Sequence, residues 1–152
     1  MNLAMQFASE PRMLSEDTAI FEAARCMGQW HVGSIVVIRD DEPVGLVTDR
    51  DLMLHGILKA RGEESIRECM SVPLVAIEKS ASVHDAVEVM RVKGIRRLGI
   101  RSGDGVLVGL VTADDFWRHL GSSMGCLAKT IQRELRVEEH PTGGKQPVLG
   151  KE

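Results

Sequence analysis

Residues 44–52 read VGLVTDRDL, and residues 108–116 read VGLVTADDF. The two stretches lie 64 positions apart, and both keep Gly, Thr and the last Asp in the same places. Repetition at a fixed period is the signature of a duplicated structural unit. The chain is therefore interpreted as two copies of one unit.

Apolar periodicity extends the repeat toward the N-terminal side of each nonapeptide. Short apolar runs at 34–38 and 97–101 predict strands, and a helical i, i+3, i+4, i+7 stripe begins at Ile20 and again at Val83. The stripes are 63 residues apart, so copy two has gained one residue before its nonapeptide. Insertions are tolerated best at hairpin tips, and the Asp-Gly pair 104–105 lies where a tip is expected. Each unit is predicted to run strand, helix, strand, strand, helix.

The same pattern divides the whole chain. Opening strands are expected at 12–14 and 74–77. Leu127, Ile131 and Leu135 recur at four-residue spacing, which predicts a further amphipathic helix. The last residues are rich in Pro and Gly and lack periodicity, so they are expected to be disordered. The predicted parts are a first repeat at 8–60, a linker at 61–69, a second repeat at 70–120, a C-terminal helix at 121–138 and a tail at 139–152.

One serine motif is judged a chance match. Residues 121–125, GSSMG, fit the G-x-S-x-G pattern of a catalytic nucleophile. That pattern requires a strand before it, and residues 115–120 are expected to be helical. We expect GSSMG to form a turn between two helices.

Composition excludes several classes of protein. Of 152 residues, 43% are hydrophobic and 27% charged, the balance of a globular protein. A net charge of -3 and 3% aromatic residues argue against nucleic-acid binding. Three widely spaced cysteines without a C-x-x-C pair indicate reduced thiols, and no apolar run reaches 18 residues. The five histidines show no metal-ligand spacing, so we expect no metal site. From the reduced thiols and the lack of a long apolar run we expect a cytoplasmic location and no membrane association.

The T-x-x-D part of the nonapeptide has two interpretations. Thr48 and Thr112 stand where a helix should begin, with Asp51 and Asp115 in the first turn. One interpretation is a capping box, in which hydroxyl and carboxylate satisfy free N–H groups at the helix start. The other is a ligand site, with a phosphate at the helix N-terminus and ribose hydroxyls on the carboxylate.

A glycine three residues before each Thr bears on the choice. Gly45 and Gly109 fall inside predicted strands, where Gly marks close approach by a ligand or by another stretch of backbone. A capping box does not require this glycine.

With its repeated motif, the chain resembles a known family, the CBS domain pair, also called a Bateman module. The resemblance rests on the stretches TAIFEAARCM, GSIVVIRDDEPVGLVTDRDL, ASVHDAVEVM and IRRLGIRSGDGVLVGLVTADDF, and covers about residues 8–120. It implies an α+β fold, with two β-α-β-β-α units packed sheet to sheet about a pseudo-twofold axis. The C-terminal helix lies outside the resemblance.

The resemblance also implies a ligand and the residues that bind it. Family members of this type bind AMP, ADP, ATP, NAD or S-adenosylmethionine between the repeats. Thr48 with Asp51, and Thr112 with Asp115, would contact ribose and phosphate.

Basic and apolar residues complete the expected site. Arg97 and Arg96 precede a strand at a position where the family often has a phosphate contact, although they can equally be a solvated strand edge. Copy one has Gly33-Ser34 there, so the two clefts should be unequal. Arg50 can reach a phosphate or pair with surface carboxylates. Val32 and Ile95 can sandwich an adenine or belong to the core.

Three functions are weighed. The first is a stand-alone regulatory sensor that binds an adenosine-containing molecule, requires no cofactor, forms a homodimer and acts on an unidentified protein. The second is a ligand-free interaction or dimerisation module. An enzyme is disfavoured because no nucleophile-base pair or metal cluster stands in a suitable context. Apolar residues in the closing helices, such as Leu52, Met53 and Trp117, are candidates for the dimer interface.

Overall fold

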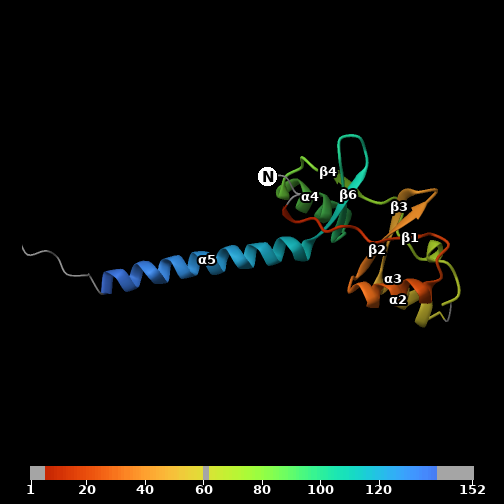
Figure 1. Cartoon of the computed structure of the whole chain (residues 1–152), viewed down its shortest axis with the longest axis horizontal. Coiled ribbons are helices and arrows are strands. Elements are labelled where there is room, and N and C mark those ends of the chain that lie inside the picture. The colour runs from red at the N-terminus through yellow and green to blue at the C-terminus, as the bar shows by residue number, and fades with distance from the viewer. Residues whose placement is uncertain (1–5, 60–61, 140–152) are drawn as a thin grey trace, which may run out of the picture. The chain divides into compact units, whose positions relative to one another are not determined.

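The computed structural model describes residues 6–59 and 62–139. They form two units, one ending at Asp115 and the other beginning at Phe116. Both sequence repeats lie in the first unit (Figure 1). The expected tail 139–152 lies outside the described residues, apart from Glu139.

The predicted order of elements is confirmed in both repeats. Each repeat has a three-stranded sheet in which the first two strands are parallel and the last two antiparallel. The first repeat contains β1 (Met13–Ser15), α2 (Ile20–Trp30), β2 (Ser34–Arg39), β3 (Glu42–Thr48), α3 (Asp49–Leu52) and a π-helical turn, η1 (Met53–Ile57). After a short 3-10 helix, η2 (Ile66–Glu68), the second repeat contains β4 (Ala76–Glu78), α4 (Val83–Lys93), β5 (Arg97–Arg101) and β6 (Leu107–Thr112), and α5 (Ala113–Glu139) follows.

The extra residue of copy two lies at the hairpin tip, as predicted. Val37 pairs with Gly45 in the first sheet, and Ile100 pairs with Gly109 in the second, so the offset changes from 63 to 64 between the two strands. The first hairpin turns through Asp40 and Asp41, both with positive φ, as in a two-residue turn of the primed type. The second turn is one residue longer and uses Gly105, at φ 85°, for its left-handed position.

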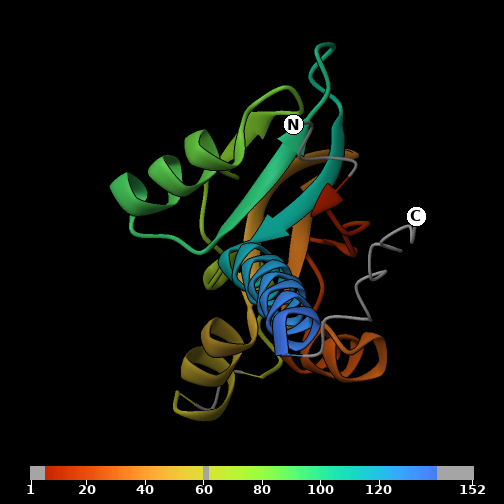
Figure 2. The same ribbon diagram turned by 90° about the vertical axis from the view of Figure 1, so that its left-hand side faces the viewer.

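The sheets of the two repeats meet face to face. Ile35 and Val37 of β2 are fully buried against α2, in the core of the first repeat. Val36 points to the opposite face, where it packs with Leu74 and Leu110 of the second half of the unit. Figure 2 shows α4 against the strands of the second repeat, both in green. Each sheet therefore has one face on its own helices and one face on the other sheet.

The connecting segments cross to the opposite repeat. The backbone of Ser71 exchanges two hydrogen bonds with Leu46 of β3, at 2.8 and 3.0 Å. Ser9 exchanges two with Leu110 of β6, both at 3.0 Å. A Cβ on Gly45 would lie 2.7 Å from the Ser71 carbonyl oxygen, and a Cβ on Gly109 would lie 2.7 Å from the Ala8 Cβ. A neighbouring stretch of the chain thus explains both motif glycines.

A buried carboxylate ties the linker to the first repeat. Glu16 accepts hydrogen bonds from Arg39 Nε at 2.8 Å and Nη2 at 2.7 Å, and from Arg67 Nη2 at 2.9 Å. Glu16 is buried, whereas both arginines reach solvent. These bonds, led by that from Arg39, lower the pKa of Glu16. The linker also places Ile66, fully buried, in the core of the first repeat.

The expected turn at 121–125 is wrong. α5 is continuous from Ala113 to Glu139, and GSSMG lies inside it. Gly and Ser are poor helix formers, which is why the sequence suggested a break. A second correction concerns Leu52, which was expected at an interface but is 4% exposed and belongs to the core of the first repeat.

Candidate functional site

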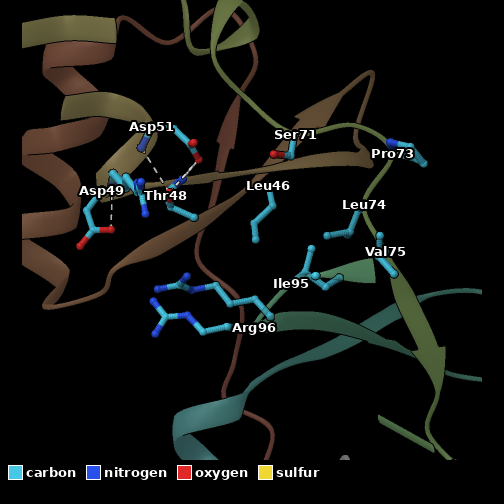
Figure 3. A pocket seen from close by; sticks show the side chains of 13 residues that line it. Leu46, Thr48, Asp49, Asp51, Ser71, Pro73, Leu74, Val75, Ile95 and Arg96 are labelled. Carbon is cyan, nitrogen blue, oxygen red and sulfur yellow. Dashed lines mark hydrogen bonds between the residues drawn. The ribbon is translucent and has the colours of Figure 1, made fainter. Parts of the chain in front are cut away.

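A cavity of about 290 Å³ lies in the first unit, with walls from both repeats and from the segment that joins them. Its volume is close to the lower limit of small-molecule sites, roughly 300 Å³. One part of the lining is apolar and the other polar, and Figure 3 shows the two parts on opposite sides. The apolar part contains Leu46, Pro73, Leu74, Val75 and Ile95, and the polar part contains Thr48, Asp49, Arg50, Asp51, Arg96 and Arg97.

The Thr48–Asp51 pair forms a capping box at the start of α3 (Figure 3). Asp51 Oδ2 accepts from Thr48 N at 2.9 Å and from Thr48 Oγ1 at 2.7 Å, and Asp51 N donates to Thr48 Oγ1 at 3.3 Å. Both bonds to the carboxylate use Oδ2, and Oδ1 makes neither of them. An ionised carboxylate can accept about four hydrogen bonds. The cap therefore leaves accepting capacity on a carboxylate that lines the cavity.

The N–H groups at the start of α3 are already bonded within the protein. Asp49 N donates to the Gly33 carbonyl oxygen at 3.2 Å, Arg50 N to Asp49 Oδ1 at 2.8 Å, and Asp51 N to Thr48 Oγ1. The phosphate position expected at this helix N-terminus stays a prediction, because an anion there would have to replace Asp49 Oδ1 as the acceptor of Arg50 N. Side chains are the other donors that could bind an anion in the cavity.

Three arginines supply positive charge to the cavity. Arg50 comes from α3. Arg97 is the first residue of β5 in the other repeat, and Arg96 directly precedes it. In Figure 3 the Arg96 side chain extends toward the side on which Thr48 and Asp49 lie. Charged arginine side chains bind phosphate oxygens through fixed pairs of N–H groups. The polar part of the cavity can therefore bind an anion beside the Asp51 carboxylate.

Gly33 faces the second-repeat arginine. A Cβ on Gly33 would lie at ordinary contact distance, 3.4 Å from Arg97 Nη2 and 3.5 Å from Asp49 Oδ2. The first-repeat residue that corresponds to Arg96 thus lies beside the Arg97 side chain of the second repeat. A long basic side chain at position 33 would occupy the same space and repel the guanidinium.

Comparison with protein families identifies the fold. The CBS domain model matches residues 7–56 and again residues 66–116, together more than half of the chain. The chain belongs to the CBS domain family. Its two matched segments coincide with the two repeats of the first unit, so the predicted CBS pair is confirmed.

Curated relatives share this pair at moderate identity. An uncharacterised protein of Methanopyrus kandleri, MK0525, is 37% identical over 123 residues, which are 79% of this chain and 60% of that protein. The CBS domain-containing protein YhcV of Bacillus subtilis is 37% identical over 103 residues, 67% of this chain and 73% of YhcV. Another uncharacterised B. subtilis protein, YlbB, is 36% identical, with 66% of its length matched. The match with this chain thus covers less than two thirds of MK0525 and of YlbB.

Solved structures show the same fold. The CBS domain protein TA0289 of Thermoplasma acidophilum, of unknown function, has a TM-score of 0.70 at 26% identity, over 78% of this chain and 68% of that one. PAE2072 of Pyrobaculum aerophilum, a complex with AMP, has a TM-score of 0.68 at 24% identity, over 76% and 89%. The CBS pair of MJ0100, a complex with 5'-methylthioadenosine and S-adenosylmethionine, has a TM-score of 0.71 at 18% identity, over 81% and 98%. The last two likenesses concern the fold alone.

The structure brings together six of the nine residues expected to form a site. Thr48, Asp51, Arg50, Ile95, Arg96 and Arg97 all line the cavity. Thr112 and Asp115 do not line it; they form the matching capping box at the start of α5, with Asp115 Oδ2 2.7 Å from Thr112 Oγ1 and 2.9 Å from Thr112 N. Val32 packs, partly buried, against the core of the first repeat.

Sequence reasoning missed the role of the start of the second repeat. Pro73, Leu74 and Val75 line the CBS cavity because residues 71–74 cross β3, and no periodic pattern indicates that crossing. Asp49 was also missed, although its position beside Thr48 in the motif could have suggested it. Among the described residues, no three His, Cys, Asp or Glu side chains gather into a metal-binding group. None of the described helices has the length and apolar character needed to cross a bilayer.

Proposed function

We propose that the chain is a regulatory CBS pair that binds an adenosine-containing molecule in the cavity between its repeats. The observation that carries this proposal is the division of one cavity into an apolar part and a part with a carboxylate and three arginines. A nucleotide has the same division, with a flat base at one end and a ribose and phosphate at the other. The complexes of PAE2072 with AMP and of MJ0100 with 5'-methylthioadenosine and S-adenosylmethionine support this choice of ligand.

The ribose is assigned to Asp51. Two of the roughly four accepting positions of its carboxylate are used by Thr48, so two ribose hydroxyls can donate to the remainder. The adenine is assigned to the apolar lining, with Ile95 and Leu74 on its faces. Ligand binding therefore leaves the capping box intact. The T-x-x-D motif can then serve both as a helix cap and as a ribose site.

The phosphate is assigned to Arg96 and Arg97, with Arg50 nearby. Asp49 lies at the same end of the cavity and limits the surplus of positive charge: three arginines against two aspartates leave a net charge of +1. A phosphate monoester carries about -1.5 to -2 near neutral pH, and each further phosphate adds negative charge next to Asp49. We therefore expect AMP to bind more tightly than ADP or ATP; NAD and S-adenosylmethionine complete the set of candidate ligands.

The regulatory part of the proposal concerns a homodimer in the cytoplasm. Phe21 of α2 and Met53 of η1 are exposed and border an apolar hollow of about 210 Å³ on the face of α2 and α3. Asp49 lines both this hollow and the nucleotide cavity, so a ligand that moves Asp49 changes the surface on which a second copy packs. A ligand shifts such an equilibrium only by its difference in affinity for the two states.

The test is a thermal unfolding series with AMP, ADP, ATP, NAD and S-adenosylmethionine at millimolar concentration. A ligand at 100 times its dissociation constant adds about 2.7 kcal/mol, or a rise in Tm of roughly 5–10 °C for a chain of this size. Asp51→Ala should abolish the rise. No rise with any of the five ligands would contradict the proposal.

The matched control is Asp85→Ala. Asp85 caps α4 with the same geometry, accepting from Ser82 N at 2.9 Å and from Ser82 Oγ at 2.7 Å, but it is exposed and does not line the cavity. Its loss should lower stability without changing the ligand-induced rise. If both variants lose stability and neither changes ligand response, the T-x-x-D carboxylate is a cap only. That result would favour the alternative function, a ligand-free interaction module.

A further inference from the structure

α5 carries an apolar stripe with no role in the cavity. Six apolar side chains recur along the helix at intervals of three and four residues, and each is at least 50% exposed. They are Trp117, Leu120, Met124, Leu127, Ile131 and Leu135. The CBS domain model ends at residue 116, so this stripe is a feature of the chain outside the family pattern.

The stripe has the form of a helix-pairing seam. The first five residues alternate three and four positions apart, which is the a and d spacing of a heptad repeat. The positions beside the seam hold small or neutral residues, namely Gly121, Ser123, Ala128 and Thr130. Such a narrow a/d stripe is typical of two helices packed on each other, whereas a helix lying on a membrane needs a broad apolar face.

The middle of α5 also needs a partner to remain helical. Gly121 and Gly125 each cost about 1 kcal/mol relative to Ala in a helix, and Ser122 and Ser123 are weaker helix formers than Ala, yet α5 continues through all of them. In proteins, helices of weak propensity persist because an apolar face is packed. The residues opposite the seam include Lys129 and Arg133, which are charged and exposed.

We propose that α5 pairs with α5 of a second copy of this chain along the seam. A helix of 27 residues is about 40 Å long, enough to contain the whole stripe. Six side chains from each copy, at roughly 100 Å² each, would bury on the order of 1,200 Å², the lower limit of a stable interface. The pair is separate from the α2 and α3 face and goes beyond the proposed sensing function.

The test measures molar mass by light scattering on the full chain at micromolar concentration. Leu127→Glu with Ile131→Glu places charges in the seam and should halve the mass, from tetramer to dimer where the α2 and α3 face also pairs and from dimer to monomer where it does not, with a loss of ellipticity at 222 nm from α5. The matched control, Lys129→Glu, changes charge on the opposite side of the helix and should alter neither. Both variants should keep the AMP-induced rise in Tm, because the cavity lies in the first unit.

Other results would overturn the pairing. A monomeric wild-type chain with full helicity would mean that the seam packs within its own chain. An unchanged mass in the double variant, together with a reduced mass in Phe21→Glu, would assign dimerisation to the α2 and α3 face alone. A wild-type chain whose Tm does not rise with AMP would count against the sensing function but not against the pairing of α5.

Discussion

Replacing Gly45 by Ala tests the crossing of the linker over β3, on which the cavity depends. The new Cβ would lie 2.7 Å from the Ser71 carbonyl oxygen, 3.0 Å from Val72 Cγ1 and 3.2 Å from Met70 Sδ. Contacts below 3 Å to a backbone atom cannot be relieved by a side-chain rotation. Ser71 is also held by two hydrogen bonds to Leu46, so moving the linker away weakens both.

The loss in free energy of unfolding caused by Gly45→Ala follows from these contacts. Overpacking a tight site costs about 1–3 kcal/mol, and each weakened backbone hydrogen bond costs about 0.5–1.5 kcal/mol. Ala restricts the unfolded chain more than Gly does, which returns about 0.5–1 kcal/mol. The middle of these ranges, with both hydrogen bonds weakened, gives a net loss of about 3 kcal/mol, or a fall in Tm of roughly 6–12 °C.

Gly28→Ala is the matched control for this substitution. It makes the same chemical change inside α2, where a Cβ would meet nothing within 4 Å. Ala is the better helix former, so this variant should gain about 0.5–1 kcal/mol. Both variants are compared with the parent by urea unfolding at one protein concentration, because association shifts apparent stability. A Gly45→Ala protein as stable as the parent would refute the crossing.

Two further predictions concern ionisable groups outside the cavity. Hydrogen bonds from Arg39, and then Arg67, lower the pKa of Glu16 from its ordinary 4.5, so its contribution to stability is present above that value and is lost as the pH falls through the lowered pKa. Glu16→Gln should therefore melt lower at pH 7 and show a smaller fall in Tm on acidification to pH 3; an identical fall would contradict this. Burial raises the pKa of the Cys69 thiol to about 11 and also raises that of Cys26, whereas Cys126 is exposed. A thiol reagent at pH 8 should modify one cysteine per native chain and three after denaturation, with Cys126→Ser removing the fast reaction.

The sequence predicted the elements of the repeat well because their signals are local. Periodicity at Ile20 and Val83 identified α2 and α4, and the change of offset located the longer hairpin near Gly105. The start of α5 followed from Thr112, but its continuation through Gly121 did not, because intrinsic propensity there opposes the helix. In the proposed pair, α5 is stabilised by burial of its apolar seam, and the seam is buried only when a second helix packs on it.

The site was predictable only in part, for a related reason. Thr48, Asp51 and Arg97 were found from the motif, since each repeat encodes its own helix start and strand start. Leu74 and Val75 were not, because they reach the cavity through long-range pairing of the linker with β3. Gly45 was a correct signal of close approach, but a glycine alone does not distinguish a ligand from a chain that passes 2.7 Å away.

The unequal basic residues of the two repeats follow from how the repeats meet. A Cβ added to Gly33 of the first repeat would lie 3.4 Å from Arg97 Nη2 of the second, so position 33 faces the side chain that follows its own counterpart, Arg96. An arginine at position 33 would bring a second positive charge next to the Arg97 guanidinium, and the like charges would repel. This chain has its arginines at 96 and 97, beside Arg50, whereas the residue corresponding to Arg50 in the second repeat is Asp114. The positive charge of these positions therefore faces the cavity described above, and charge repulsion between positions 33 and 97 favours that asymmetry.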